Sequence, residues 1–219
     1  HAETRYRLLF QVSSEAVMIV DAASSMILDA NPDVTSKAGL FKKVWAEQYK
    51  GMVEYRPQHK TIAVDAKTNT VKFDVQDDVK AAVLNVIPSM RAGAIAVKAG
   101  LNNQANSRWC GVNYLTFEST AAKDVHVLGD SIQIAPAMPK SAHMANSHGK
   151  VAASAIVAQL AGWDVNPAPM LTNTCYSFVD EKNVVHVASV HEYVALEKTF
   201  KAVATSGGLS TAPSEQEGV

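Results

Sequence analysis

The feature that most constrains the fold is a strand, a turn, a helix and a second strand in direct succession. The apolar segment VHVLGD predicts a central β-strand that ends in the turn Gly129-Asp130. A helix rich in small residues follows, approached through Pro139, and the segment NTCYS around Cys175 predicts the next strand. Alternating strands and helices are typical of α/β folds, so this order predicts the α/β class.

Flanking segments add local signals for helices and hairpins. Residues 38–51 place apolar side chains at helical spacing, and residues 91–101 predict a shorter helix. The segment TIAVDAKTNTVKFDVQ alternates around the turn residues 67–69 and predicts a hairpin, while AAVLNVI at 81–87 is apolar enough for a second central strand. Further strands are expected at MVEYRP, at NTCYSFV and, after a turn at 180–183, at VVHVASVHEYV.

The long helix has recognisable ends. Ser141 or Asn146 can cap its start, because a short polar side chain accepts a hydrogen bond from a first-turn amide. Gly162 is placed to end it, since glycine adopts the left-handed conformation common at helix C-termini. Ala, Val, Ile and Leu fill the body of the helix between these ends, and these residues alone are consistent with an ordinary, well-capped core helix.

Composition excludes some classes of function. The chain has 219 residues, 47% of them hydrophobic and 19% charged, so it can bury a core. A formal net charge of -1 gives no basis for nucleic-acid binding, which needs clustered Lys and Arg. No apolar run is long enough to span a bilayer. The start HAETRYRLLF lacks the apolar core of an intact signal peptide, although a processed periplasmic chain would look the same.

The N-terminal segment predicts a helix followed by a short hairpin. The sequences RYRLLFQVSSEAVMIVD and ILDANP, within residues 5–33, carry a resemblance to the opening of a PAS sensor domain. That resemblance implies a role in sensing or dimerisation, and a flavin- or haem-binding photosensory module is a further reading. The plain structural alternative is a helix and hairpin packed on the next domain.

From Ala38 to Ser210 the chain resembles the flavoprotein subunit of flavocytochrome c sulfide dehydrogenase, a relative of the sulfide:quinone oxidoreductases. The segments that carry this resemblance are LFKKVWAEQY, MVEY, VLNVIPSMRAGAIAVKAGL, WCGV, TFEST, VHVLGD, MPKSAHMANSHGKVAA and NTCYS. The resemblance implies an incomplete two-dinucleotide-domain flavoprotein that uses FAD. It further implies sulfide as substrate, a c-type cytochrome subunit as partner, and a periplasmic location.

The same resemblance assigns cofactor-binding positions around the turn and the start of the long helix. They are Gly129, Asp130, Pro139, Lys140, Ser141 and Asn146. The turn would approach the ribityl chain, where Asp130 could accept hydrogen bonds from hydroxyls. The positive end of the helix dipole would favour negative charge at the N1/O2 edge of reduced flavin, and Lys140 would add to it.

Cys175 is the catalytic candidate. The resemblance makes it one half of a redox-active disulfide beside the flavin, with its partner upstream of Ala38 in family order and thus missing here. Cys110 does not match that partner. The residues alone favour two buried free thiols, and a disulfide between Cys110 and Cys175 stays open at this point. The paired histidines are five residues apart, a spacing that does not favour a shared metal, so no metal site is expected.

The sequence also departs from the family pattern. No G-x-G-x-x-G turn follows an opening strand, so the grip on the FAD pyrophosphate is missing and FAD affinity should be weak. Apolar strands without neighbours indicate a rearranged core, a homo-oligomer or a subunit of a larger assembly. The expected divisions are 1–33, 34–163 and 164–219. Whether this chain is an active enzyme stays open, and the alternative is a non-catalytic PAS-like sensory or dimerisation fusion.

Overall fold

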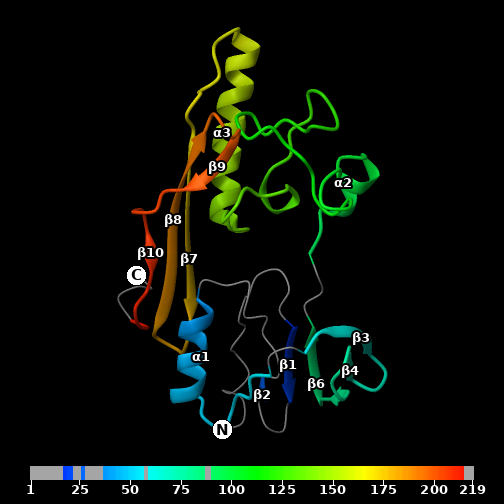
Figure 1. Ribbon diagram of the computed structural model, residues 1–219. Coiled ribbons are helices and arrows are strands. Elements are labelled where there is room, and N and C mark those ends of the chain that lie inside the picture. Colours follow the sequence, from blue (N-terminus) through cyan, green and yellow to red (C-terminus); the bar gives the residue numbers. More distant parts are fainter. Residues whose placement is uncertain (1–16, 22–25, 28–36, 57–58, 87–89, 215–219) are drawn as a thin grey trace. The chain divides into compact units, whose positions relative to one another are not determined.

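Two compact units make up the protein (Figure 1). The computed structural model describes residues 17–21, 26–27, 37–56, 59–86 and 90–214. The first unit comprises His1–Met90, Ser177–Val185 and Ser210–Val219, and the second comprises Arg91–Tyr176 and His186–Leu209. Each unit is therefore assembled from stretches that are far apart in the sequence, and the divisions expected from the sequence stay predictions.

Helix α1, Ala38–Glu47, anchors the first unit, as its helical spacing predicts. The apolar face of the helix is buried at Phe41, Val44 and Trp45, where it packs against Val179 and Val185 from the C-terminal hairpin. The hydroxyl of Tyr49, just beyond the helix, donates to the Val179 carbonyl at 2.7 Å. One amphipathic helix thus joins two sequence-distant parts of the unit.

The predicted hairpin around residues 67–69 is confirmed. Strands β3 (Thr61–Asp65), β4 (Thr70–Phe73) and β5 (Val79–Lys80) form an antiparallel sheet in that order. The Asp65 carboxylate accepts the Lys67 amide at 2.9 Å, and Asn69 adopts the left-handed conformation with a φ of 52°. Such side-chain-to-backbone bonds are the ordinary chemistry of Asp and Asn in turns. The prediction of a strand at MVEYRP is wrong, because residues 52–56, its described part, form no strand.

A second small sheet in this unit corrects the expectation for AAVLNVI. Strands β2 (Met26–Ile27), β1 (Val17–Asp21) and β6 (Val83–Val86) pair in the order β2-β1-β6. Strand β6 lies at the edge of this sheet rather than in its centre, and Val83 is 52% exposed. An apolar run favours a strand, but it does not predict how many neighbouring strands pair with it.

The N-terminal prediction is only partly within the described residues. The β1–β2 pairing agrees with the predicted hairpin, with Val20 opposite Ile27. The helix expected before it lies outside the described residues. Because β1 also pairs with β6 over four residue pairs, the hairpin belongs to a sheet shared with a later part of the chain. The resemblance to a PAS domain is therefore not confirmed.

The second unit contains the longest helix, α3, Ala142–Ala161, with the ends that the sequence predicts. Ser141 is the N-cap residue, and Gly162 is the C-cap residue in the left-handed conformation with a φ of 71°. The shorter helix α2, Ala94–Lys98, also agrees with its prediction. The buried cluster beside α3 contains Phe117, Ile132, Ala135, Met138, Met144, Ala152, Leu171 and Phe200.

A sheet with a long C-terminal hairpin completes the fold. Its strands are β7 (Met170–Phe178), β8 (Val184–Val194), β9 (Thr199–Ala202) and β10 (Gly208–Leu209). The order is β10-β8-β7, with β9 also paired to β8, and the β8–β9 and β8–β10 pairs are antiparallel. Asp180 accepts the amides of Lys182 and Asn183, which confirms the predicted turn.

The prediction of a central strand at VHVLGD is wrong. These residues form no named strand; His126 makes an isolated bridge to Glu118, and a short 3-10 helix, η2, begins at Gly129. Val125 and Leu128 are exposed rather than covered on both faces. The fold is mixed α and β with antiparallel sheets, and within its described residues no helix is long and apolar enough to cross a membrane.

Candidate functional site

The predicted turn at Gly129-Asp130 exists and packs against helix α3. Gly129 begins η2, Gly129–Ser131, with a φ of +69°, a conformation that side chains disfavour. A Cβ placed on Gly129 would lie 3.2 Å from the Cβ of Ala145, so the turn approaches the second turn of the helix closely. Asp130 is exposed beside this contact, which leaves its carboxylate available for a ligand.

His148 holds the buried side of the turn. The Gly129 amide donates to His148 Nδ1 at 3.1 Å, and the histidine is 1% exposed. Its ring stacks on Phe117, with the ring centroids 4.6 Å apart and an interplanar angle of 30°. Burial, together with the positive charges of Lys140 and His191, lowers the pKa of His148 to about 4. His148 is consequently neutral near pH 7.

Lys140 holds the other side of the same turn. Its ammonium donates to the carbonyl of Asp130 at 2.5 Å and to that of Ile132 at 3.1 Å. The nitrogen also lies 3.7 Å from the centroid of the Trp109 ring, a cation–π contact. Burial lowers the pKa of Lys140 to about 8, although the Asp130 carboxylate opposes this shift. Lys140 therefore braces the turn from which Asp130 projects.

The N-terminus of α3 is capped by a hydroxyl that is part of a longer polar chain. Ser141 Oγ accepts the Met144 amide at 3.0 Å and donates to Asn173 Oδ1 on β7. Of the two cap candidates, Ser141 is the residue used, whereas Asn146 lies within the helix and is exposed. Pro139 is half-buried just before this start. The helix start carries partial positive charge from its unpaired amides.

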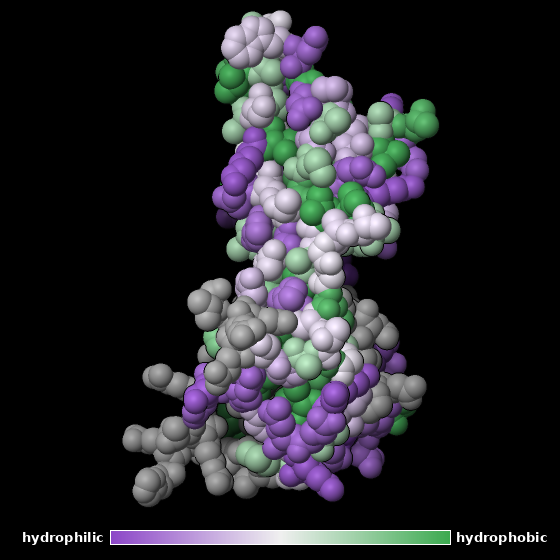
Figure 2. Space-filling model, turned by 90° about the vertical axis from the view of Figure 1, so that its left-hand side faces the viewer, coloured by the Kyte–Doolittle hydropathy of each residue, from purple (hydrophilic) through white to green (hydrophobic). Residues whose placement is uncertain are grey.

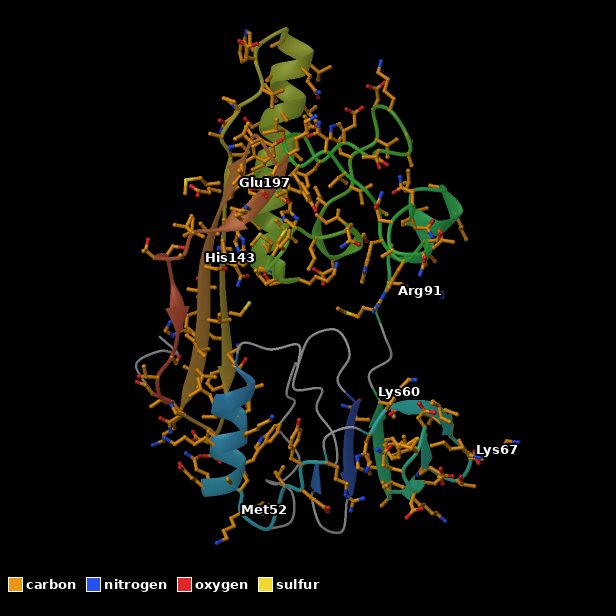
Figure 3. The ribbon with its side chains drawn as sticks, viewed as in Figure 1. Met52, Lys60, Lys67, Arg91, His143 and Glu197 are labelled. Carbon is orange, nitrogen blue, oxygen red and sulfur yellow. The ribbon has the colours of Figure 1, made fainter. Side chains whose placement is uncertain are left out.

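Further polar contacts join α3 to strand β7. The Thr174 amide donates to His143 Nδ1 at 3.1 Å, and His143 Nε2 lies 3.3 Å from the Thr172 hydroxyl. Ser147 donates to the Thr172 carbonyl at 3.1 Å and accepts the Thr172 amide at 3.4 Å. Figure 3 shows the labelled His143 beside this strand. These bonds, here called the α3–β7 seam, fix the strand segment that leads into Cys175.

Cys175 lies at the end of the polar chain that starts at the helix cap. Its Sγ is 3.5 Å from Asn173 Oδ1, and its side chain is half-buried. Neither Cys175 nor Cys110 is in a disulfide. Cys110 is completely buried, and burial raises the pKa of its thiol despite the nearby charge of Lys140. Cys175 is thus the more accessible of the two thiols and the better nucleophile.

The structure brings the predicted residues together in two connected groups within the second unit. Gly129, Asp130 and Lys140 form the turn and its brace, and Ser141 is linked to Cys175 through Asn173. For Pro139 and Asn146, only their places beside and within the start of α3 are shown. The polar turn and the positive helix end are each suited to a polar or anionic group, and the half-buried thiol lies at the other end of the Ser141–Asn173 chain.

Three residues of this region were not predicted: His143, His148 and Asn173. The five-residue spacing of the histidines predicts surface or packing residues, because that spacing addresses only a shared metal ion. Asn173 had a usable signal, since Leu171 and Asn173 share the buried face of β7 and a buried amide demands partners. Its Nδ2 is buried with no hydrogen-bond partner in the described part of the chain.

Two family models match the chain. Residues 14–88 match the model described as sulfide dehydrogenase [flavocytochrome c] flavoprotein chain, central. Residues 167–219 match the model described as flavocytochrome c sulphide dehydrogenase, flavin-binding. The second match includes Asn173 and Cys175. The first match begins at residue 14, so it also covers part of the stretch that resembles a PAS domain.

Solved structures with the same fold are only distantly similar in sequence. The sulfide:quinone oxidoreductase from the hyperthermophilic bacterium Aquifex aeolicus matches with a TM-score of 0.57 and 15% identity over 83% of this chain. A chain of the Tetrahymena thermophila mitochondrial ATP synthase matches with a TM-score of 0.51 and 20% identity over 73% of this chain. The chain spans 41% and 37% of the lengths of these two chains.

Proposed function

Because the chain belongs to the flavocytochrome c sulfide dehydrogenase flavoprotein family, we propose that it is part of an FAD-linked oxidoreductase that oxidises sulfide. The observation that carries this proposal is the match of residues 167–219 to the flavin-binding region, joined in the structure to the capped start of α3. A c-type cytochrome is the proposed electron acceptor, since the family is the flavoprotein chain of a flavocytochrome. The proposed location is the periplasm.

The residues around α3 fit the polar parts of a flavin. The exposed Asp130 carboxylate is suited to accept hydrogen bonds from ribityl hydroxyls, and the turn before it is braced on both sides. The start of α3, capped by Ser141, offers partial positive charge to an anionic ring edge. Bound FAD would accept an electron pair from reduced sulfur and release electrons singly to a haem partner.

An unpaired polar atom supports the same assignment. Asn173 is 2% exposed, and its Nδ2 has no acceptor among the described residues while its Oδ1 serves Ser141 and Cys175. A buried amide without a partner is costly, so natural proteins usually supply one from a ligand, a water or another segment. An acceptor on a bound ligand near Cys175 would satisfy this amide.

Cys175 is the proposed point of contact with sulfide. When its sulfur is bonded to a second cysteine of the enzyme, attack by HS⁻ breaks that bond, the second thiolate leaves, and Cys175 carries a persulfide. The hydrogen bond from Cys175 to Asn173 and the α3–β7 seam hold the strand that presents this sulfur. The completely buried Cys110 is poorly placed to exchange with solvent thiols.

An absorbance spectrum of the purified protein, before and after incubation with FAD, tests the proposal. We expect weak binding, seen as a shift of the flavin bands when FAD is titrated into the protein, and we expect these bands to bleach when sulfide is added under anaerobic conditions. FAD spectra that stay identical with and without the protein would overturn the assignment of a flavin site to this chain.

The cysteine is tested by two matched variants. Cys175→Ala should slow sulfide-dependent bleaching at least tenfold, because the sulfur that meets sulfide is removed. Cys110→Ala is the control, since it removes a thiol that is buried and outside the α3–β7 seam. Equal bleaching rates in Cys175→Ala and the unmodified protein would remove Cys175 from the reaction while leaving the flavin assignment intact.

A further inference from the structure

We propose that His148 is a positioning residue that fixes the Gly129-Asp130 turn through a single neutral tautomer. Its functional meaning rests on the proposed function, because the turn carries the carboxylate assigned to the ribityl chain. The structural statement is independent of any flavin: one ring nitrogen of a buried histidine holds the Gly129 amide at the start of the turn that carries Asp130. No sequence motif marks His148 for this role.

The hydrogen bond to Gly129 determines the tautomer. A backbone amide only donates, so the Nδ1 atom that receives it at 3.1 Å must carry a lone pair. The proton of the neutral ring is therefore on Nε2. Gly129 is itself buried and lies outside any strand, so no sheet partner takes its amide. Without His148 this buried donor would lose its acceptor.

The opposite side of the ring shows that histidine is not there for packing alone. His148 Nε2 is buried and has no partner among the residues that the structure describes. An apolar side chain would stack on Phe117 without burying an unpaired nitrogen, and buried unpaired polar groups are disfavoured. The nitrogen that is paired, Nδ1, is thus the reason for a histidine at this position.

Neighbouring basic side chains reinforce the neutral form. Lys140, from the loop before α3, and His191, from β8, both act on His148, and each disfavours a second positive charge. Lys140 is held in place by the carbonyls of Asp130 and Ile132. The turn is consequently fixed at three backbone atoms, the Gly129 amide and two carbonyls, by one neutral and one cationic side chain.

The tautomer can be measured directly in the protein without added flavin. Long-range ¹H–¹⁵N correlation spectra of ¹⁵N-labelled protein distinguish a protonated from an unprotonated ring nitrogen. We expect His148 to show an unprotonated Nδ1 and a protonated Nε2 that persist unchanged from pH 8 to pH 5. A protonated Nδ1, or a doubly protonated ring at pH 6, would overturn the proposal.

Two substitutions separate positioning from packing. In His148→Asn the side-chain oxygen can take the place of Nδ1, whereas His148→Leu fills the site without an acceptor. Amide hydrogen exchange of Gly129 should be about tenfold or more faster in His148→Leu and close to the unmodified rate in His148→Asn. His191→Leu is the control, because it removes another completely buried histidine of the same unit. Equal exchange at Gly129 in all three variants would contradict the role.

FAD affinity then distinguishes this inference from the proposed function. If the unmodified protein binds FAD, His148→Leu should weaken binding more than His148→Asn does. If the unmodified protein binds no FAD, the proposed function fails, while the tautomer and the Gly129 exchange rates still decide the positioning role. Equal FAD affinity in both variants would show that the turn position does not matter for the cofactor.

Discussion

The two units bury different kinds of side chain. The first unit is built on apolar clusters, such as Phe41, Trp45 and Val179 around α1. Its ion pairs lie at the surface, and its buried Lys37 donates to Ser177 Oγ. The second unit buries His148 and His191 beside its apolar cluster, together with Asn173. On the face shown in Figure 2, hydrophobic and hydrophilic residues are interspersed. Apolar burial supplies most of the stability, whereas buried hydrogen bonds determine which arrangement is adopted.

The largest effect should come from a residue that serves both the apolar cluster and the buried polar groups. Phe117 is completely buried and stacks on His148. Phe117→Ala should lower the free energy of unfolding by about 3–5 kcal/mol, since it leaves a cavity and loosens the histidine. Urea unfolding with the Gly129 amide as a local probe measures it. Trp45→Ala, in the first unit, should lower the free energy of unfolding by a similar amount without changing the exchange rate of the Gly129 amide. Faster Gly129 exchange in Trp45→Ala would contradict the expected difference between the units.

Acid should destabilise the second unit at higher pH than the first. The pKa of His148 is lowered from its ordinary value of 6.5 to about 4. The unfolded chain therefore binds a proton that the folded one does not, and stability falls as pH drops from 6.5 towards 4, by up to about 3 kcal/mol. In the first unit, the hydrogen bond from Arg56 lowers the pKa of Glu54. The stabilisation from this hydrogen bond is therefore lost only when the pH falls below 4.5, the ordinary pKa of a glutamate. Unfolding curves from pH 7 to 3.5, read with probes in each unit, check the order.

Loss of the helix cap should have an intermediate effect. Ser141→Ala removes the acceptor of the Met144 amide and the donor to Asn173, which should cost about 1 kcal/mol. Ser141→Asp restores the cap but places a charge beside Asn173. Helix α1 starts at Lys37 with no side-chain cap, and the buried Lys37 ammonium instead donates to Ser177 Oγ at 2.6 Å. Thermal unfolding of the two Ser141 variants measures the cap, and equal stability of Ser141→Ala and the unmodified protein would contradict its role.

The smallest effect is expected at a surface ion pair. Lys60 contacts the Asp74 carboxylate at 3.2 Å in the first unit, and its side chain is 76% exposed. Lys60→Ala should change the free energy of unfolding by less than about 0.5 kcal/mol, because solvent and salt screen such pairs. Lys140→Met, which keeps the apolar stem of a half-buried lysine, should cost more. Urea unfolding at low and high salt tests both, and a salt-sensitive loss at Lys60 would contradict the expectation.

Local sequence signals predicted the helices and hairpins well. The bounds of α3 follow from Ser141 and Gly162, and the two hairpins follow from the turn chemistry of Asp65, Asn69 and Asp180. These signals act between residues that are close in the chain, so a single sequence contains both partners. The two predictions of central strands were wrong: AAVLNVI contains an edge strand, and VHVLGD forms no named strand. Strand partners come from residues far away in the sequence, which local patterns do not contain.

The site was predicted in part for the same reason. Gly129 and Ser141 could be found from the turn and cap they form locally. His148 is 19 residues from Gly129, and Asn173 is 32 residues from Ser141. The sequence near each residue therefore does not predict either hydrogen bond. Period-two alternation could have placed Asn173 inside β7, but its partner depends on how α3 lies against the strand.

The α3–β7 seam also limits how this protein can associate. Strand β7 ends the order β10-β8-β7, so its outer backbone groups would normally be open to pairing with a strand of another molecule. At Thr172 and Thr174 those groups are already bonded to Ser147 and His143 of the same chain. The helix thus closes this stretch of sheet edge with its own side chains. A homo-oligomer built by extending the sheet through these residues would first have to break the contacts that hold the cysteine strand in place.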